Sequence, residues 1–472
     1  MHIRELAGKK VCILGYGREG KAMAAALEEY AKGCTITIAD KNQEAKITKY
    51  ESQLGENYLR NIDRFDVVIK SPGIPPRELS DLSPTLITTP TQIFFDSIKD
   101  SGAIVIGVTG SKGKSTTSSL IHAILKASLS SKKTPLPVGI HTSPLPAAAI
   151  RKSQPPDQSA VCEPLLRGGG ESFLVGNIGD PAIAHLKDAK PNTIFVLEMS
   201  SYQLMDLTVS PHIAVVTAFF PEHLDYHGSL EAYLEAKKNI TKFQKANDVV
   251  FFNADYPEAK KIADGSIGTK MPFTKKDAPV RLEDIQLKGE HNLGNIAAAW
   301  KVCEQLGIPK ETAIEAINKF KGLPHRLESL GVHDDIEWVN DSISTTPESA
   351  IAALKALGNR VSVIILGGQD RGYDFGLLAK KIKESPTLRM AILLPDSGTV
   401  IGKALEHAGA AVILSNAETI EEAVHTARVT ALDPKPDNGL IPIVLLSPAA
   451  PSYGHFKNFE ERGEMFKQAV QG

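Results

Sequence analysis

The sequence predicts an α/β protein whose sheets are mostly parallel. Two observations support this fold class. Strand-like apolar runs alternate with helical segments along the chain, which is the pattern of βαβ units. Three of the runs, at residues 9–17, 102–110 and 360–368, lead into glycine turns, as buried parallel strands do at binding loops. A chain of 472 residues is too long for one core, so we expect three domains.

The remaining elements follow from short apolar runs and from longer amphipathic segments. Further strands are expected at residues 35–40, 66–71, 194–201, 213–219, 390–396 and 442–448. Helices are expected at 20–31, 115–127, 230–243 and 420–431.

The expected domain boundaries lie near Phe95, before the second glycine-loop unit begins, and near Gly322, where Gly and Pro separate helical from extended patterns. The predicted domains are therefore 1–95, 96–322 and 323–472. Residues 128–171 break the alternation, because they contain seven prolines and no apolar periodicity. We interpret them as a mobile surface insertion.

Composition indicates an ordinary globular protein, with 23% charged residues and a formal net charge of −2. We expect no nucleic-acid partner and no membrane partner. Cys12, Cys34, Cys162 and Cys303 lack metal-ligand spacing, and the N-terminus lacks the apolar core of a signal peptide. A cytoplasmic location with reduced cysteines is expected.

A phosphate-binding loop is predicted at "TGSKGKST", residues 109–116. Gly110, Gly113, Lys114 and Ser115 stand between a strand and a helix, so backbone N–H groups would hold phosphates, Lys114 would reach the terminal phosphates and Ser115 would bind Mg²⁺. The spacing is not the complete P-loop pattern, because Val108 occupies the first glycine position. The alternative is a glycine turn followed by a surface lysine, and an ATP or GTP loop is favoured.

The first glycine motif, "GYGREG", places Gly15, Gly17 and Gly20 after a strand, with Asp40 ending the next one. An NAD site has this pattern, and so does an anion site for any nucleotide diphosphate. Farther on, Ser71 and Gly73 of "KSPGIPP" follow another strand, where they either contact a ligand or form a plain proline turn.

A glutamate and a histidine, Glu198 and His223, lie at or just after the ends of two later strands. Glu198 ends an apolar strand, at the edge where open α/β sheets bind ligands, and a buried carboxylate there requires a cation or hydrogen-bond donors. His223 lies just after the next strand, where it serves either chemistry or the structure of a loop.

Lys237 occupies an unusual position in the predicted helix 230–243. Ser229 caps this helix, and Lys237 lies on the apolar stripe formed by Leu230, Tyr233, Leu234 and Ile240. Its stem either runs along the core to water or ends in a buried neutral amine. A neutral amine reacts with CO₂ to give a carbamate, which would act as a carboxylate ligand of Mg²⁺.

The ordered motifs resemble the Mur ligases of peptidoglycan synthesis, and within them the glutamate-adding branch. They are "TGSKGKST", "GNIGDP", "LEMSSYQL", "FPEHLDYHGSLEAYLEAKKNI", "GEHNLGNIAAAW", "LPHRLE", "NDSIS" and "LLSPAAPSYGHFKNFEERG". The resemblance covers nearly the whole chain except 128–171. It implies a Rossmann-like N-terminal domain for a UDP-sugar, a central P-loop ATPase domain, and a Rossmann-like C-terminal domain for glutamate.

The resemblance also implies roles for individual residues. The UDP-substrate would be bound by Gly15, Gly17, Asp40, Ser71, Gly73 and Asn177. ATP would be bound by Gly110, Gly113, Lys114, Ser115, Thr116, Asn292, Asn295, Arg326 and Asp341. Two Mg²⁺ ions would be held by Ser115, Glu198, His223 and carbamylated Lys237, and the catalytic set would be Lys114, Glu198, His223 and Lys237.

The implied reaction joins glutamate to UDP-N-acetylmuramoyl-L-alanine through an acyl phosphate, with ATP as the phosphoryl donor and a monomeric enzyme. Thr345, Arg371, Ser452 and Phe459 would bind glutamate. The family as a whole favours D-glutamate, whereas Ile343 and Arg371, both in place of the usual lysine, resemble a smaller branch that adds L-glutamate. A folylpolyglutamate-type ligase, a nucleotide-dependent oxidoreductase and a P-loop switch are the alternatives.

Overall fold

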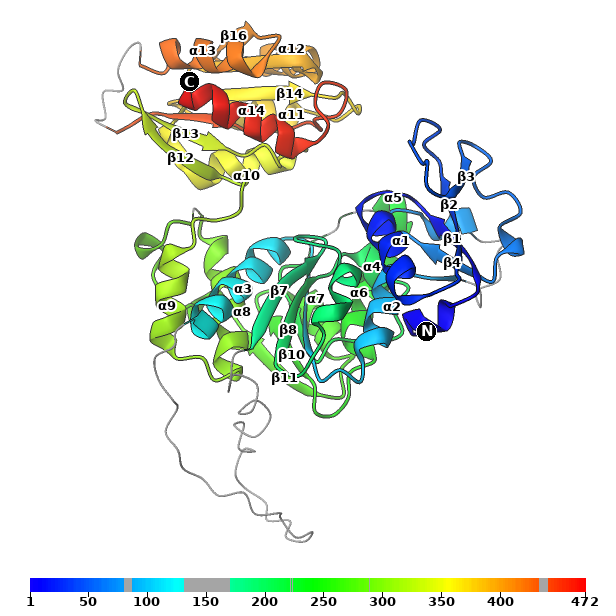
Figure 1. Ribbon diagram of the computed structural model, residues 1–472. Helices are drawn as coiled ribbons and strands as arrows, with labels where there is room; N and C mark the ends of the chain where they lie inside the picture. The colour runs from blue at the N-terminus through cyan, green and yellow to red at the C-terminus, as the bar shows by residue number, and fades with distance from the viewer. Residues whose placement is uncertain (80–86, 131–169, 221, 223, 288, 433–439) are drawn as a thin grey trace. The chain divides into compact units, whose positions relative to one another are not determined.

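The structure is a computed structural model that describes residues 1–79, 87–130, 170–220, 222, 224–287, 289–432 and 440–472. It forms two compact units, one of Met1–Arg281 with His291–Ile317 and one of Leu282–Glu290 with Asn318–Gly472. The first unit contains two parallel sheets and the second contains one mostly parallel sheet, so the predicted α/β class is confirmed (Figure 1). Most of the segment expected to be an insertion, and Cys162, lie outside the described residues.

The first sheet has the strand order β3-β2-β1-β4-β5, and every pairing is parallel. Its elements are β1 Lys10–Leu14, α1 Arg18–Tyr30, β2 Thr35–Asp40, β3 Glu51–Leu54, β4 Val67–Lys70, β5 Ile87–Thr88 and α2 Pro90–Ile98. Because β1 lies between β2 and β4, the loops after these three strands meet at one edge.

The second sheet has the order β11-β10-β9-β6-β8-β7 and is also parallel. Its strands are β6 Ile104–Thr109, β7 Glu171–Gly176, β8 Thr193–Glu198, β9 Ile213–Val216, β10 Val249–Asn253 and β11 Thr269–Phe273. The helices are α3 Lys114–Ser130, α4 Ser201–Leu204, α5 Leu224–His227, α6 Leu230–Lys242, α7 Pro257–Ala263, α8 His291–Gln305 and α9 Lys310–Lys319. Here β6 lies between β8 and β9, so the loop after β6 lies at the switch point of the sheet.

The third sheet has the order β12-β13-β17-β14-β15-β16, with only the β12–β13 pairing antiparallel among the described strands. Its strands are β12 Glu328–His333, β13 Ile336–Asn340, β14 Val361–Gly368, β15 Met390–Asp396, β16 Ile413–Asn416 and β17 Ile443–Leu446. The helices are α10 Pro347–Leu357, α11 Gly376–Lys383, α12 Ser397–Ala408, α13 Ile420–Thr430 and α14 Phe459–Gln471.

A continuous apolar core joins the first two sheets. Helix α2 begins at a Thr89 cap and buries Ile93, Phe94 and Phe95, and the Phe94 ring meets the Phe195 ring of β8 edge-to-face at 5.3 Å. Burying one such aromatic side chain contributes about 1.5–3 kcal/mol. The predicted domain boundary at Phe95 lies inside α2, and the one at Gly322 lies just after α9. Both boundaries stay predictions.

None of the helices in the described ranges is long and apolar enough to cross a membrane. The three cysteines that the structure describes, Cys12, Cys34 and Cys303, are free thiols. Burial raises the pKa of the Cys12 thiol to about 12 and that of Cys34 to about 11, so both are protonated at neutral pH.

Candidate active site

The glycine turn after β1 is closed by side chains from the two neighbouring strands. Gly15 has a φ of +86°, and its carbonyl accepts a hydrogen bond from Ser71 Oγ at 3.0 Å. Asp40 Oδ2 accepts the backbone N–H of Tyr16 at 2.6 Å, so this carboxylate supports the turn. A Cβ on Gly20 would lie 2.0 Å from the Gly15 carbonyl oxygen, which explains why this position is glycine.

The structure therefore brings together the predicted residues of the first glycine motif. Gly17 is the N-cap of α1, and Gly73 is exposed two residues after Ser71. Asn177 lies on the loop after β7, and Arg18, the first residue of α1, donates a hydrogen bond to its carbonyl oxygen at 3.0 Å. The helix N-terminus is thus bordered by loops from both sheets, an arrangement suited to an anion.

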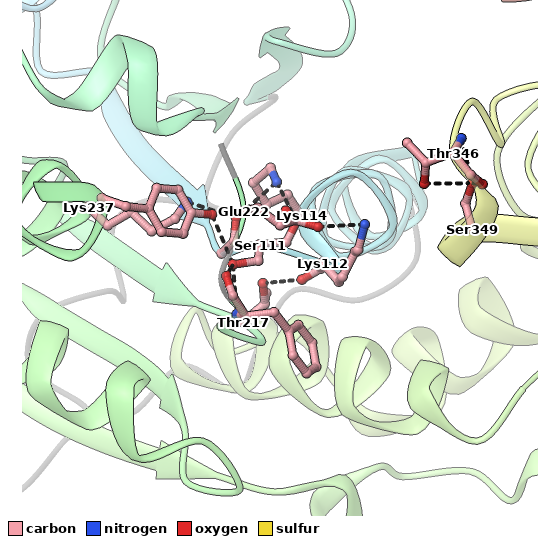
Figure 2. Close-up of polar contacts among 11 residues, drawn as sticks. Ser111, Lys112, Lys114, Thr217, Glu222, Lys237, Thr346 and Ser349 are labelled. Atoms are coloured by element: carbon pink, nitrogen blue, oxygen red, sulfur yellow. Dashed lines mark hydrogen bonds and ion pairs between the residues drawn. The ribbon is translucent and has the colours of Figure 1, made fainter. Parts of the chain in front are cut away.

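The predicted phosphate loop connects β6 to α3. Gly110 and Gly113 have positive φ values of +151° and +88°, which side-chain-bearing residues rarely adopt. Lys114 Nζ donates to the carbonyl oxygens of Gly110 at 2.9 Å and Ser111 at 2.8 Å (Figure 2). Ser115 and Thr116 follow in the first turn of α3, where their backbone N–H groups belong to the helix N-terminus.

Helix α8 places two buried amides against this loop. A Cβ on Gly113 would lie 2.2 Å from Asn295 Oδ1, so only glycine allows this approach. Asn295 Nδ2 in turn donates to Asn292 Oδ1 at 2.8 Å. The two asparagines predicted from a distant motif thus lie beside the phosphate loop.

Lys237 is buried in the first unit, and this excludes the interpretation in which its stem runs to water. Its Nζ donates to the Gly110 carbonyl at 2.9 Å and lies 4.7 Å from the centroid of the Tyr233 ring. Burial, and then the nearby charge of Lys114, hold the pKa of the Lys237 amine well below its ordinary value. The predicted cap is confirmed, because Ser229 Oγ accepts the N–H of Ala232 at the start of α6.

Glu198 ends β8 and is almost fully buried, with 1% of its surface exposed. Its Oε1 accepts a hydrogen bond from Asn177 Nδ2 at 3.0 Å. Its Oε2 is also buried and has no hydrogen-bond partner among the described residues. A buried carboxylate oxygen of this kind is satisfied by a cation or by a hydrogen-bond donor, so the residue fits a Mg²⁺ ligand.

Within the described residues, no group of three or more His, Cys, Asp or Glu side chains converges as a metal site. A site completed by Ser115, by substrate oxygens and by a modified Lys237 would not have such a group. His223 lies outside the described residues. Its neighbour Glu222 forms an ion pair with Lys112 of the phosphate loop at 2.6 Å.

In the second unit, Arg326 and Asp341 lie near the start of the third sheet. Asp341 is fully buried, and its carboxylate accepts hydrogen bonds from the Leu327 N–H, from Ser344 Oγ and from Ser447 Oγ. Burial raises its pKa to about 6. Arg326 lies between two residues with positive φ, His325 at +61° and Leu327 at +44°.

Of the residues predicted to bind glutamate, Thr345, Arg371 and Ser452 lie on the loops after β13, β14 and β17, and Phe459 is the first residue of α14. The Arg371 guanidinium lies 5.9 Å from the centroid of the Tyr453 ring, next to the buried Ser452. The carbonyl oxygen of Phe459 accepts a hydrogen bond from Ser342 Oγ at 2.8 Å, and Thr345 follows in that loop. The sheet therefore gathers these loops at its carboxyl edge.

Comparison with known proteins agrees with this geometry. Residues 174–278 match the model of the Mur ligase middle domain. A Salinispora tropica protein named UDP-N-acetylmuramoyl-L-alanine–L-glutamate ligase is 32% identical over 100% of this chain and 99% of its own. The chain belongs to the Mur ligase family. It is accordingly an ATP-dependent ligase of peptidoglycan precursor synthesis.

A second relative, from Symbiobacterium thermophilum, is named UDP-N-acetylmuramoylalanine–D-glutamate ligase and is 31% identical over 98% of both chains. The solved structure of UDP-N-acetylmuramate-alanine ligase from Thermotoga maritima has the same fold, with a TM-score of 0.55, 16% identity, and coverage of 98% of this chain and 99% of that one. This Mur ligase is thus similar to relatives whose names differ in the configuration of glutamate.

Sequence reasoning missed two residues that organise the sites of this Mur ligase. Thr217 follows β9, and its Oγ1 lies 2.7 Å from the Lys112 carbonyl and 3.1 Å from the Thr109 carbonyl. Its single proton is donated to one or shared between the two, so the hydroxyl holds the phosphate loop. A hydroxyl directly after the apolar run "IAVV" was the available signal.

The second missed residue is Arg462 of α14, which is fully buried. Its guanidinium donates to Ser342 Oγ, to the Ser342 carbonyl, and to the carbonyls of Gly367 and Ala450, at 2.8 to 3.4 Å. Arg462 thereby ties the loops after β13 and β17 to the end of β14. Only its position in "FEERG", on a helix that otherwise reads as amphipathic, was visible in the sequence.

Proposed function

We propose that this protein joins glutamate to UDP-N-acetylmuramoyl-L-alanine, using ATP and releasing ADP and phosphate. The names of the two relatives support the substrates. The observation that carries the chemistry is the convergence of Lys114, the buried Lys237 and the unsatisfied Glu198 at the carboxyl edge of the second sheet. This is where a terminal phosphate and a carboxylate, both anionic, would have to meet.

The UDP-sugar would bind at the carboxyl edge of the first sheet. The N-terminus of α1 suits its diphosphate, and Gly15, Gly17 and Gly73 leave room for backbone approach. Asp40, Ser71 and Asn177 are the proposed polar partners at this edge. Asp40 Oδ2 accepts a hydrogen bond from the turn, and the carboxylate can still accept a further hydrogen bond from a ligand.

ATP would occupy the loop of Gly110, Gly113, Lys114, Ser115 and Thr116. Asn292 and Asn295 are proposed to contact the adenine, and their burial beside Gly113 supports this role. Arg326 and Asp341 are proposed to contact the phosphates and the ribose.

Two Mg²⁺ ions are proposed at Ser115, Glu198, His223 and Lys237, with Lys237 carrying a carbamate derived from CO₂. When bound, the ions offset the charge that develops on the phosphates and on the carboxylate. The low pKa of the Lys237 amine supports the modification, because only a neutral amine adds to CO₂. The unsatisfied Oε2 of Glu198 supports its role as a ligand.

The reaction would proceed in two steps. A carboxylate oxygen of the alanyl group attacks the γ-phosphorus of ATP, the bond from phosphorus to the β,γ-bridging oxygen breaks, and ADP leaves. The glutamate amine then attacks the acyl carbon, the carbon–oxygen bond to phosphate breaks, and the nitrogen loses a proton. Lys114 would hold the transferred phosphoryl group in line through fixed positive charge.

The configuration of glutamate separates two versions of this function. The family as a whole favours D-glutamate, whereas Ile343 and Arg371 favour the L-glutamate branch. Arg371 would grip a carboxylate with a planar fork, which a lysine cannot do. Thr345, Ser452 and Phe459 are the other proposed glutamate contacts.

A coupled assay of phosphate release tests the proposal. Release should require UDP-N-acetylmuramoyl-L-alanine and glutamate together, with kcat/KM measured separately for D- and L-glutamate. A preference of more than about 100-fold, roughly 2.7 kcal/mol, decides the configuration. Phosphate release with a folate substrate instead of the UDP-sugar would contradict the proposed function.

A further inference from the structure

Arg18 lies in the variable part of the first glycine motif, and it is the first residue of α1. A cation at this end of a helix faces the positive pole of the helix dipole, so its placement requires compensation. Its guanidinium receives that compensation from the loop after β7. Nη1 donates to the Gly179 carbonyl at 2.9 Å, and Nη2 donates to the carbonyls of Gly176 at 2.8 Å and Asn177 at 3.0 Å.

The loop that Arg18 holds is the one that orients Glu198. The Asn177 side chain donates to Glu198 Oε1 at 3.0 Å, and the Asn177 backbone N–H donates to the Glu198 carbonyl at 3.1 Å. Gly176 has a φ of +101°, and a Cβ there would lie 2.5 Å from the Glu198 carbonyl oxygen. The loop and the end of β8 therefore form one closely packed unit.

We propose that Arg18 is a positioning residue for the metal site. By clamping three carbonyls of the loop 176–179, it fixes Asn177, and Asn177 fixes the Glu198 carboxylate with Oε2 directed away from the loop donor. This inference rests on the proposed role of Glu198 as a Mg²⁺ ligand. It assigns a function in the second sheet to a residue of the first, across about 160 residues of sequence.

The fork of the arginine matters to this role. A guanidinium presents several N–H donors in one plane and can reach separate carbonyls at once, whereas an ammonium is a point charge on a flexible stem. Lys21 offers a matched control, because it lies exposed in the same helical turn. Its Nζ lies over the Tyr16 ring at 5.7 Å and, among the described residues, makes no hydrogen bond to the loop 176–179.

The test titrates Mn²⁺ into the full-length protein with a non-hydrolysable ATP analogue present and measures bound metal by electron paramagnetic resonance. Arg18→Ala should weaken Mn²⁺ binding about 10-fold, the lower end of the range for residues that orient a ligand. Arg18→Lys should stay weakened, and Lys21→Ala should bind as the wild type does. Recovery with lysine would overturn the proposal, since charge alone would then suffice.

A second variant separates positioning from general destabilisation. In an Asn177→Ala background, Arg18→Ala should have little further effect on Mn²⁺ affinity, because both act through the same hydrogen bond to Glu198. Additive losses would overturn the proposal. If Glu198→Gln binds Mn²⁺ as tightly as the wild type, the proposed metal site itself fails, whereas normal binding by Arg18→Ala alone rejects only the role of Arg18.

Discussion

Lys237 and Arg462 are both buried basic side chains at the carboxyl edges of parallel strands, but their surroundings stabilise the positive charge to different extents. Lys237 donates to one carbonyl and, at 3.4 Å, to the Thr109 hydroxyl, and Lys114 lies near it. Arg462 donates to three carbonyls and one hydroxyl. Burial lowers the pKa of Arg462 to about 9, so it stays charged at neutral pH, whereas the pKa of Lys237 falls well below its ordinary value.

The difference indicates two uses of a buried cation. Arginine retains its proton and brings five donors, so it can tie together loops permanently. For a lysine with few acceptors and a positive neighbour, the lowered pKa favours the neutral amine. The buried lysine of the second sheet thus suits the proposed chemistry, whereas the buried arginine of the third sheet is a structural clamp.

The largest expected effect is that of Lys237→Ala on turnover. We expect kcat to fall by about 1,000-fold, roughly 4 kcal/mol, because the carbamate proposed on Lys237 is lost from the proposed phosphoryl-transfer site. The measurement is the phosphate-release assay. Lys238→Ala is the control, since Lys238 pairs with the exposed Glu235 and should be dispensable.

Chemical rescue of Lys237→Ala sharpens the comparison. A small carboxylic acid should restore part of the activity if Lys237 acts as a carbamate. Rescue by a small amine instead would mean that the lysine acts as a cation, like Arg462. Near wild-type turnover of the variant would show that the amine has no role.

Arg462→Ala should destabilise the second unit by about 3 kcal/mol, because several buried carbonyls lose their donor. Urea unfolding can be followed by Trp338 fluorescence in a Trp300→Phe background, which leaves one tryptophan, in the second unit. Gln468→Ala, on the exposed face of the same helix, should change the free energy by less than about 0.5 kcal/mol. Equal midpoints for Arg462→Ala and Gln468→Ala would contradict the clamp.

Lys237→Met should raise the unfolding free energy at neutral pH, measured without metal and without CO₂. Lys237 has a pKa near 10.4 in the unfolded state and a lower pKa in the folded state. At pH values between these two, the unfolded state binds more protons than the folded state. Wild-type stability therefore rises with pH in this window, and the advantage of Lys237→Met shrinks by at most about 1.4 kcal/mol per pH unit.

Trp300 fluorescence in a Trp338→Phe background reports the first unit in this experiment. Lys238→Met is the matched control and should show no such pH dependence. An advantage of Lys237→Met that is equal at pH 7.5 and pH 9.5 would mean that the folded lysine is charged.

The smallest expected effect concerns Asp341, whose pKa is raised to about 6 by burial. Because this folded pKa exceeds the unfolded value near 3.9, the folded state binds more protons between them, and stability rises by about 1 kcal/mol as the pH falls from 7 to 5. Asp341→Asn should remove this rise in stability, which is measured by urea unfolding followed by Trp338 fluorescence. A variant with the wild-type pH profile would place the titration elsewhere.

Much of the fold and part of the site could be predicted from the sequence alone. Continuous apolar runs predicted the parallel strands, and glycines after strands predicted the binding turns. Ser229 and the apolar stripe of the following helix placed Lys237 on the apolar face of α6. These are local patterns, since backbone conformation and amphipathic spacing depend on neighbours within a few residues.

Tertiary structure decided the contacts between residues that are distant in sequence. The hydrogen bonds of Arg18 to Gly176, of Thr217 to Lys112 and of Arg462 to Ser342 span more than 100 residues each. The loops in these contacts are brought together by the order of strands in the sheets. A local sequence pattern therefore does not specify which carbonyl such a donor reaches. The lowered pKa of Lys237 likewise depends on tertiary structure, since its causes are the burial of the amine and the charge of Lys114, which only the packed fold places beside it.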